Sequence, residues 1–243
     1  MMYNKARARP EKTKEWFRKK TIKALGSDYP VDKHFNPTYF PWDQRVCMIP
    51  DGDMFIAIKE GRASVETDHI EHFTKNGIKL KSGEELSADV IITATGLNVV
   101  FGGGAEIMVD GQVTNPADSF GYKGMMYSGV PNIVTVFGYT NAAWTLRADL
   151  ISQFALRVIT HMKQHGHTRA VPVTPDGMPR HPWIDFQAGY LLRVMDQLPS
   201  SGDRHPWLNI QDYKTDQKLM LEDPIDDGAL IFSNIVSKQM AAE

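Results

Sequence analysis

The sequence is poor in cysteine and contains no long apolar run. A single cysteine among 243 residues, Cys47, excludes an internal disulfide framework and any zinc or iron–sulfur site built from several cysteines. No window reaches the roughly 18 consecutive apolar residues of a membrane span, and the N-terminal residues include no apolar signal region. We therefore expect a cytoplasmic protein without a transmembrane segment.

Several catalytic signatures are also missing. The sequence contains no GxSxG, so hydrolase chemistry has no support. It contains no HExxH, and three histidines near the end of a predicted helix, His161, His165 and His167, are explained better by the helix dipole than by a metal. Gly102 and Gly104 begin a GxGxxG, but its third glycine is replaced. A glycine loop for dinucleotide phosphates is thus missing from these residues.

The remaining composition is ordinary for a globular protein, with 42% hydrophobic and 23% charged residues. This balance excludes disorder over the whole length and suits one large domain or two small ones. The charge is uneven, since the first 25 residues hold nine Lys or Arg against two Asp or Glu. A basic arm can indicate nucleic acid, but an amphipathic helix with lysines around Trp16 and Leu25 explains it better. We therefore expect no nucleic-acid partner.

Hydrophobic periodicity predicts the helices. One is expected up to about Leu25, a short one over 53–61, and another over 183–198. Residues 28–44, rich in proline and aromatic side chains, are expected to form a packed connection. The clearest helix spans 142–165, where apolar residues recur every four positions and Arg147 takes another face. Those apolar residues are Leu146, Leu150, Phe154, Val158 and Met162.

Apolar runs predict the strands. Short strands are expected at 45–49, within 63–73 and at 78–80, and the tail holds short apolar pieces that end near 229–232. The runs 88–96 and 131–139 are nearly unbroken apolar segments, which is typical of strands buried in a parallel sheet. The order of elements therefore predicts an α/β fold that resembles the second half of a nucleotide-binding domain.

Two of these predicted strands end on residues suited to a ligand. The strand over 88–96 ends on Thr95 and Gly96, and the other leads through Gly138, Thr140 and Asn141 into a long helix. Glycine lets the backbone approach a phosphate or a ring, and a helix N-terminus offers N–H groups and a positive dipole end. The alternatives are an ordinary turn after the first strand and simple N-capping after the second.

Arg45 stands where the aromatic connection enters a predicted strand. A guanidinium at that point can stabilise an anion. A salt bridge at the rim of the domain is the commoner explanation of such a residue.

Three runs resemble one known family. HFNPTYFPWDQRVCMIPDGDMFIAI (34–58), ADVIITATGLNV (88–99) and VFGYTNAAWTLRADL (136–150) are similar to the C-terminal half of flavin-containing monooxygenases, above all the class B, Baeyer–Villiger type. The likeness covers nearly the whole chain. The first and third runs are specific to the family, whereas the ATG run is shared by many flavoproteins.

The resemblance implies an α/β fold that is the remainder of a two-dinucleotide-binding-domain (FAD/NAD(P)) flavoprotein monooxygenase without its N-terminal Rossmann glycine motifs. Residues 1–44 would end a helical insertion, 45–96 would be the C-terminal part of an NADPH-binding domain, and 97–243 the C-terminal part of an FAD-binding domain. The family signature FxGxxxHxxxW is incomplete, because Ile107 stands at the histidine position. We therefore expect a portion of a longer protein that is inactive and poorly soluble by itself.

The resemblance also implies residue roles. Arg45 aligns with an arginine that stabilises the peroxyflavin anion and helps to position the nicotinamide. The segment that includes Trp144, Thr145 and Leu146 corresponds to the helix N-terminus that faces the flavin pyrimidine carbonyl. With the glycines and polar residues of the two strand ends, these side chains form the predicted FAD and NADPH site.

The implied reaction uses NADPH to reduce FAD, after which O2 adds to the reduced flavin. The resulting peroxyflavin attacks a ketone to give an ester, or oxygenates a sulfide or an amine. Gln44 stands where relatives often have a lysine that recognises the extra phosphate of NADPH. The alternative from another functional class is a non-catalytic remnant or interaction module with the same fold.

Overall fold

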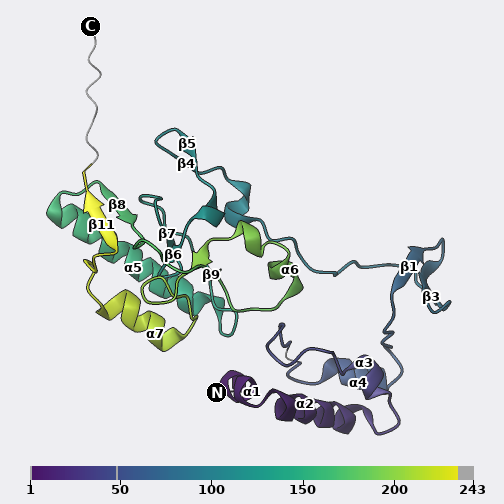
Figure 1. Ribbon diagram of the computed structural model, residues 1–243. Helices are drawn as coiled ribbons and strands as arrows, with labels where there is room; N and C mark the ends of the chain where they lie inside the picture. The colour runs from purple at the N-terminus through teal and green to yellow at the C-terminus, as the bar shows by residue number, and fades with distance from the viewer. Residues whose placement is uncertain (1, 48, 235–243) are drawn as a thin grey trace. The chain divides into compact units, whose positions relative to one another are not determined.

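The computed structural model describes residues 2–47 and 49–234. The chain forms two compact units, residues 1–97 and 98–243, called unit 1 and unit 2 here (Figure 1). Each unit is described by itself. Their assignment to the NADPH-binding and FAD-binding parts of a monooxygenase stays a prediction.

The helices of unit 1 lie in its first 59 residues and are α1 (Met2–Ala8), α2 (Pro10–Leu25), α3 (Val31–His34) and α4 (Asp53–Lys59). The predicted helix up to Leu25 is confirmed, although it is broken at Arg9. The break follows from Pro10, because a residue before proline is disfavoured in helical geometry. Gly26, with φ 101°, ends α2.

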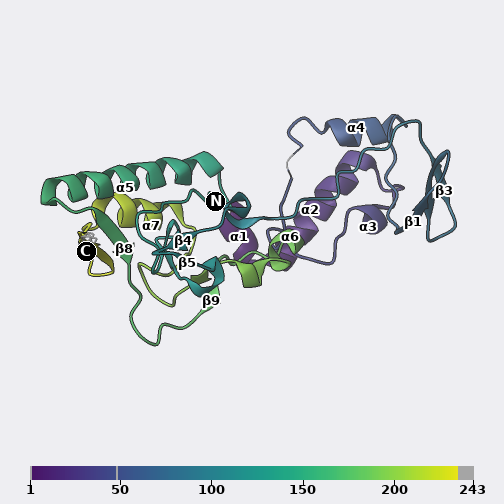
Figure 2. The same cartoon turned by 90° about the horizontal axis from the view of Figure 1, so that it is seen from above.

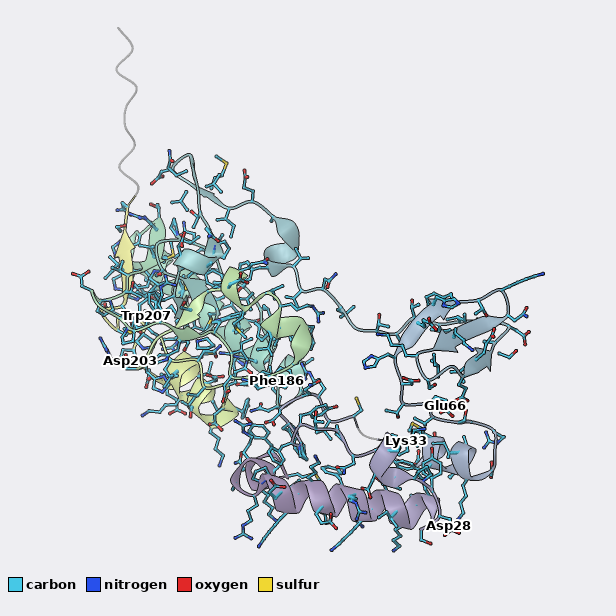
Figure 3. All side chains as sticks on the ribbon, turned by 45° about the vertical axis from the view of Figure 1, so that its right-hand side comes forward. Asp28, Lys33, Glu66, Phe186, Asp203 and Trp207 are labelled. Atoms are coloured by element: carbon cyan, nitrogen blue, oxygen red, sulfur yellow. The ribbon has the colours of Figure 1, made fainter. Side chains whose placement is uncertain are left out.

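A small core joins these helices. Leu25, Val31 and Ile58 are buried together, and an ion pair of 3.9 Å between Lys33 and Glu66 ties α3 to the chain that follows α4 (Figure 3). The strands predicted within 63–73 and at 78–80 are confirmed. With a third strand they form an antiparallel sheet ordered β1 (Ile70–Phe73), β2 (Gly77–Leu80) and β3 (Glu85–Ser87).

Three predicted strands do not form. Residues 88–96 belong to no strand, and Val90 and Ile92 are 77% and 84% exposed. The described residues of 45–49 and of 131–139 also contain no strand, and Met48 lies outside the described residues. A continuous apolar strand is stable between the neighbouring strands of a buried sheet, and residues 2–47 and 49–234 do not supply those neighbours. The predicted parallel sheet is therefore wrong for this part of the chain, where the named strands all pair antiparallel.

Unit 2 is built around α5 (Trp144–His165), which confirms the helix predicted over 142–165 (Figure 2). Gly166, in the left-handed conformation with φ 68°, ends the helix. The apolar residues of its buried face are Leu150, Ile151, Phe154 and Val158. Their spacing of three and four residues is that of an amphipathic helix whose stripe faces the core.

Short elements surround α5. The strand pairs are β8 (Arg169–Pro172) with β11 (Leu230–Ser233), β6 (Gly121–Tyr122) with β7 (Met126–Tyr127), β9 (His181–Pro182) with β10 (Ser200–Ser201), and β4 (Met108–Val109) with β5 (Gln112–Val113). The short helical turns are η1 (Phe101–Gly104), η2 (Pro116–Asp118), α6 (Gly189–Leu192), η3 (Met195–Gln197), α7 (Tyr213–Gln217) and η4 (Lys218–Glu222). The short apolar piece near 229–232, to which the sequence analysis assigned no element, forms most of β11.

The helix predicted over 183–198 is wrong. Only α6 and η3 form within this range, and residues 183–188 belong to no helix. Ile184, Phe186 and Ala188 are buried while Asp185 and Gln187 are exposed. This alternation has the period of an extended chain and not of a helix, so the apolar side chains enter a second core cluster from irregular backbone.

Three tyrosines lie in the interior of unit 2. The Tyr122 hydroxyl donates to Asp227 Oδ2 at 2.6 Å, the Tyr139 hydroxyl donates to Asp216 Oδ2 at 2.8 Å, and Tyr127 bonds to a threonine hydroxyl. Burial raises the pKa of all three phenols, that of Tyr127 to about 12. The folded state therefore keeps phenolic protons that the unfolded chain releases near pH 10.

We predict that unit 2 loses stability as the pH rises above about 10. A group with a raised folded pKa contributes stability below its unfolded pKa and loses it as the pH rises through the folded value. The phenolate absorbance of these three tyrosines should therefore appear together with the loss of circular dichroism. Tyr127→Phe removes one linked group and should make the loss with pH shallower. Ionisation of all eight tyrosines at unchanged circular dichroism would contradict this account.

Candidate functional site

The loop that leads into α5 is packed by aromatic rings. Gly138 is buried under the Trp144 indole, and a Cβ added at position 138 would lie 2.3 Å from that ring. The Phe137 ring centroid lies 5.1 Å from that of Trp144 and 4.8 Å from that of Trp183. The glycine is therefore required by the first side chain of α5, a reason that the sequence pattern does not reveal.

Thr140 and Asn141 do not cap α5. The N-cap residue is Ala143, which makes no side-chain capping hydrogen bond. Both polar residues instead bond to Gln211. Its Oε1 accepts from Thr140 N at 3.1 Å and from Thr140 Oγ1 at 2.7 Å, and its carbonyl oxygen accepts from Asn141 Nδ2 at 3.2 Å. The N-capping alternative is therefore wrong, and these side chains fix the loop itself.

Gln211 is a site residue that the sequence analysis missed. It is 5% exposed, has φ 51°, and donates through Nε2 to the Gly138 carbonyl oxygen at 3.1 Å. A non-glycine residue in the left-handed region is strained and persists where its contacts hold it there. No pattern marks this glutamine, because it lies in an irregular stretch 73 residues from its partner Gly138.

The first turn of α5 is open within unit 2. Trp144 and Leu146 are 46% and 42% exposed, and Thr145 is also exposed. No side chain caps the helix, so the first backbone N–H groups lie uncapped at the positive end of the helix dipole. This geometry suits an electron-rich carbonyl oxygen or an anion that lies beside the indole.

Arg147 is fully buried beneath this turn, although the sequence pattern placed it off the core face. Its Nη2 donates to Asn209 Oδ1 at 2.9 Å, and its Nε lies 3.2 Å from Asp216 Oδ2. Burial raises the pKa of Asp216, and the Arg147 charge opposes that rise. A buried guanidinium is tolerated only with such partners, so this cluster fixes the start of α5.

The remaining predicted site residues belong to unit 1. Arg45 is exposed in the irregular chain that follows the Pro41 to Gln44 bridge. Thr95 and Gly96 are exposed, and Gly96 has φ 103°, a conformation that favours glycine. The predicted site residues that unit 2 brings together at the start of α5 are Gly138, Thr140, Asn141, Trp144, Thr145 and Leu146.

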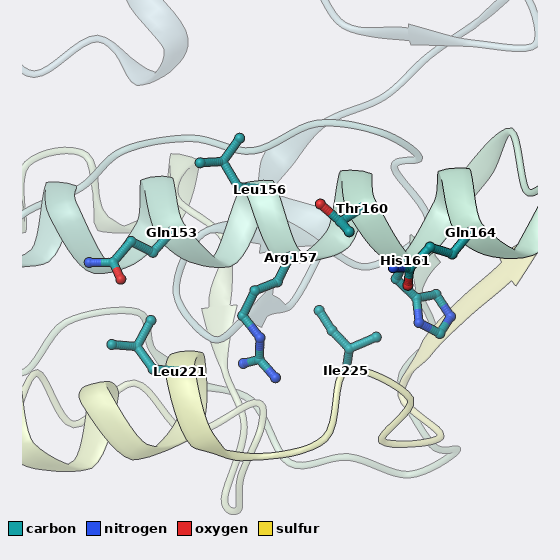
Figure 4. Close-up of a pocket in the computed structure, with 8 residues that line it drawn as sticks. All are labelled: Gln153, Leu156, Arg157, Thr160, His161, Gln164, Leu221 and Ile225. Carbon is teal, nitrogen blue, oxygen red and sulfur yellow. The ribbon is translucent and has the colours of Figure 1, made fainter.

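A groove of about 570 Å³ lies farther along α5 (Figure 4). Arg157 occupies it and donates to the carbonyl oxygens of Met220 and Asp223, the second at 2.8 Å. This arginine ties α5 to η4. The groove contains none of the predicted site residues; its lining comprises Gln153, Leu156, Arg157, Thr160, His161, Gln164, Leu221 and Ile225.

The histidines at the end of α5 stack instead of converging on one point. The ring centroids of His161 and His165 are 4.2 Å apart, and those of His165 and His167 are 6.2 Å apart. Across residues 2–47 and 49–234, no group of three His, Cys, Asp or Glu side chains could hold a metal ion. Over the same part of the chain, no helix combines the length and the apolar character needed to cross a bilayer.

We predict that Gln211→Met destabilises unit 2 by about 1–3 kcal/mol, because it leaves the Thr140 N–H and the Gly138 carbonyl without their partner. Amide exchange at Thr140 should accelerate more than exchange in the middle of α5. Gln153→Met is the matched control, since that exposed side chain bonds to Asp149 on the same helix, and it should change stability by less than about 0.5 kcal/mol. Equal effects of the two substitutions would contradict the role given to Gln211.

Comparison with known proteins identifies relatives along nearly the whole chain. The chain is 46% identical over 232 residues, 95% of its length, to the FAD-containing monooxygenase EthA of Mycolicibacterium smegmatis, and it covers 47% of that protein. It is 44% identical over 233 residues to the EthA of Mycobacterium tuberculosis, covering 48% of it. It is 42% identical over 202 residues to a probable FAD-binding monooxygenase AlmA of an Acinetobacter species, covering 41% of it. No protein-family model matches the chain.

The chain spans about half the length of the curated relatives that it matches. The identity extends over both units, so it is not confined to one motif. The mixed helix and strand content also fits an α/β protein of this kind. The resemblance drawn from the three sequence runs is therefore confirmed: over the portion that it spans, the chain is homologous to the FAD-containing monooxygenases.

Proposed function

We propose that the chain is the C-terminal portion of an FAD- and NADPH-dependent monooxygenase. The complete protein would insert one oxygen atom from O2 into a ketone, as in a Baeyer–Villiger reaction, or into a sulfide or amine. The observation that carries this proposal is the 44 to 46% identity to proteins named FAD-containing monooxygenases. The assignments of NADPH as a cofactor and of the Baeyer–Villiger class rest on the resemblance of the three sequence runs.

The start of α5 fits one part of a bound FAD. The flavin is a flat ring system with carbonyl oxygens on its pyrimidine side, and the uncapped first turn beside an exposed indole offers N–H groups to such an oxygen. When bound, FAD supplies the redox chemistry that activates O2. The residues that we assign to the flavin are Gly138, Thr140, Asn141, Trp144, Thr145 and Leu146.

Unit 1 residues would serve NADPH and the reacting oxygen. Arg45 carries a permanent charge, so in a site closed to water it would stabilise negative charge on the oxygen and orient the nicotinamide. Thr95 and Gly96 would let the backbone approach the cofactor closely. The glycine loop for the FAD pyrophosphate is not among these residues, so the other half of the protein would supply it.

The second candidate is a non-catalytic remnant or interaction module of the same fold. The missing glycine motif and the exposed apolar chain at Val90 and Ile92 favour it. Mixing the purified chain with FAD separates the two: yellow flavin retained through gel filtration supports a cofactor-binding portion. A stably folded chain that stays colourless supports the remnant.

We predict that residues 1–243 expressed alone oxidise no NADPH above background with FAD and a small ketone or sulfide. The preparation should also aggregate, because each exposed Val or Ile forgoes roughly 1.5–3 kcal/mol of burial and exposed apolar chain associates. NADPH absorbance and light scattering measure the two effects, with complete EthA of Mycolicibacterium smegmatis as the control. A soluble monomer that turns over substrate would show that the other half is not required.

A further inference from the structure

α2 presents one strongly basic side to solvent within unit 1. This side, the lysine face, consists of five exposed residues: Lys12, Trp16, Lys19, Lys20 and Lys23. At about 100° per residue, all five positions lie within roughly 60° of Trp16 around the helix axis. Figure 3 shows long side chains that project from α2.

The opposite side of α2 belongs to the core of unit 1, where Leu25 is buried and Ile22 packs against the same cluster. Both glutamates of the helix, Glu11 and Glu15, lie about 100° or more from Trp16, outside the lysine face. Arg18, also off this face, is paired with Asp32 at 2.6 Å. Lys14 lies on the opposite side as well, where it bonds to the Pro37 carbonyl oxygen. Most of the unbalanced positive charge of α2 is therefore on the side that faces away from the core.

The lysine face is unfavourable for a helix that contacts only water. Lys23 lies four residues after Lys19 and three after Lys20, so their charges repel each other. Glu15 approaches Lys19 at 3.7 Å, but both side chains are largely exposed and the pair is screened. Trp16 is 45% exposed, and Lys20 Nζ lies 5.5 Å from its ring centroid. Such a surface indicates a partner that neutralises the lysines and takes up the indole.

We propose that the lysine face binds the chain to an anionic lipid surface. Lysine stems can lie along the membrane boundary while their ammonium groups reach lipid phosphates, and tryptophan is favoured at the headgroup level. α2 has 16 residues and is rich in charge, so it would lie in the plane of the surface. This contact uses unit 1 only and none of the residues assigned to the flavin.

Positive charge alone would also suit a nucleic acid. Nucleic-acid sites add several stacking aromatic rings, or arginine, asparagine and glutamine groups that bond to bases. The lysine face has one aromatic ring and none of those polar groups. Its chemistry therefore favours lipid headgroups.

Vesicle flotation with the full chain tests the proposal, because aggregated protein sinks while vesicle-bound protein rises. The chain should float with vesicles of phosphatidylcholine and phosphatidylglycerol, and not with phosphatidylcholine alone. Binding should weaken as salt is added. Equal flotation with both vesicle types, or no flotation with either, would overturn the proposal, as would tighter binding to duplex DNA at the same salt.

Substitutions separate the two contributions. The triple variant Lys12→Gln, Lys20→Gln and Lys23→Gln should weaken vesicle binding by about tenfold or more, since the charge attraction is lost. Trp16→Ala keeps the charge and should weaken binding several-fold through the lost ring insertion. Unchanged binding of both variants would overturn the assignment to this face.

A matched control carries the same change in net charge elsewhere in unit 1. Lys59, Lys75 and Lys81 are exposed and lie outside α2. Replacing all three by glutamine should leave vesicle binding within about twofold of the unmodified chain. A loss equal to that of the lysine-face variant would show that net charge, and not the lysine face, is responsible.

Discussion

The buried ion pair between Arg147 and Asp216 determines how unit 2 is arranged where α5 begins. A guanidinium without solvent contact must keep its partners, so α7, which carries Asp216, is held against the first turn of α5. Asn209 bonds to the same guanidinium, and Gln211, two residues later, reaches the loop before α5. The Arg147 charge thus positions the segment that contains Asn209 and Gln211, and Gln211 in turn fixes the loop before the uncapped start of α5.

Sequence patterns predicted the elements whose stability is local. α5 was predictable because its apolar stripe repeats at helical spacing, and the break at Gly166 follows from glycine chemistry. The structure of the apolar run 88–96 was not predictable, because an apolar strand needs neighbouring strands that its own sequence does not specify. Arg147 was misplaced for a related reason: its burial depends on Asp216, which is 69 positions later and has no sequence pattern that connects it.

In the candidate site, too, local features were predictable and contacts between distant residues were not. Gly138, Thr140 and Asn141 do lie directly before a long helix, but Gly138 was placed in a strand that does not form, and the N-capping alternative for the other two was wrong. The glycine accommodates Trp144, and the polar side chains bond to Gln211 instead of capping the helix. Gln211 had no sequence signal, because its role comes from a strained backbone conformation that only the fold creates.

Homology to half of a flavin monooxygenase and the exposed apolar chain in unit 1 lead to our central proposal, that this chain would complete a flavin site only together with the other half of such a monooxygenase. The direct test is to co-express residues 1–243 with the remaining half of the EthA sequence of Mycolicibacterium smegmatis, which we expect to carry the glycine motif, and to measure bound flavin after purification. The account predicts that the two polypeptides co-purify and that the pair retains more FAD than residues 1–243 retain alone. A pair that fails to associate, or that associates without flavin, would contradict it.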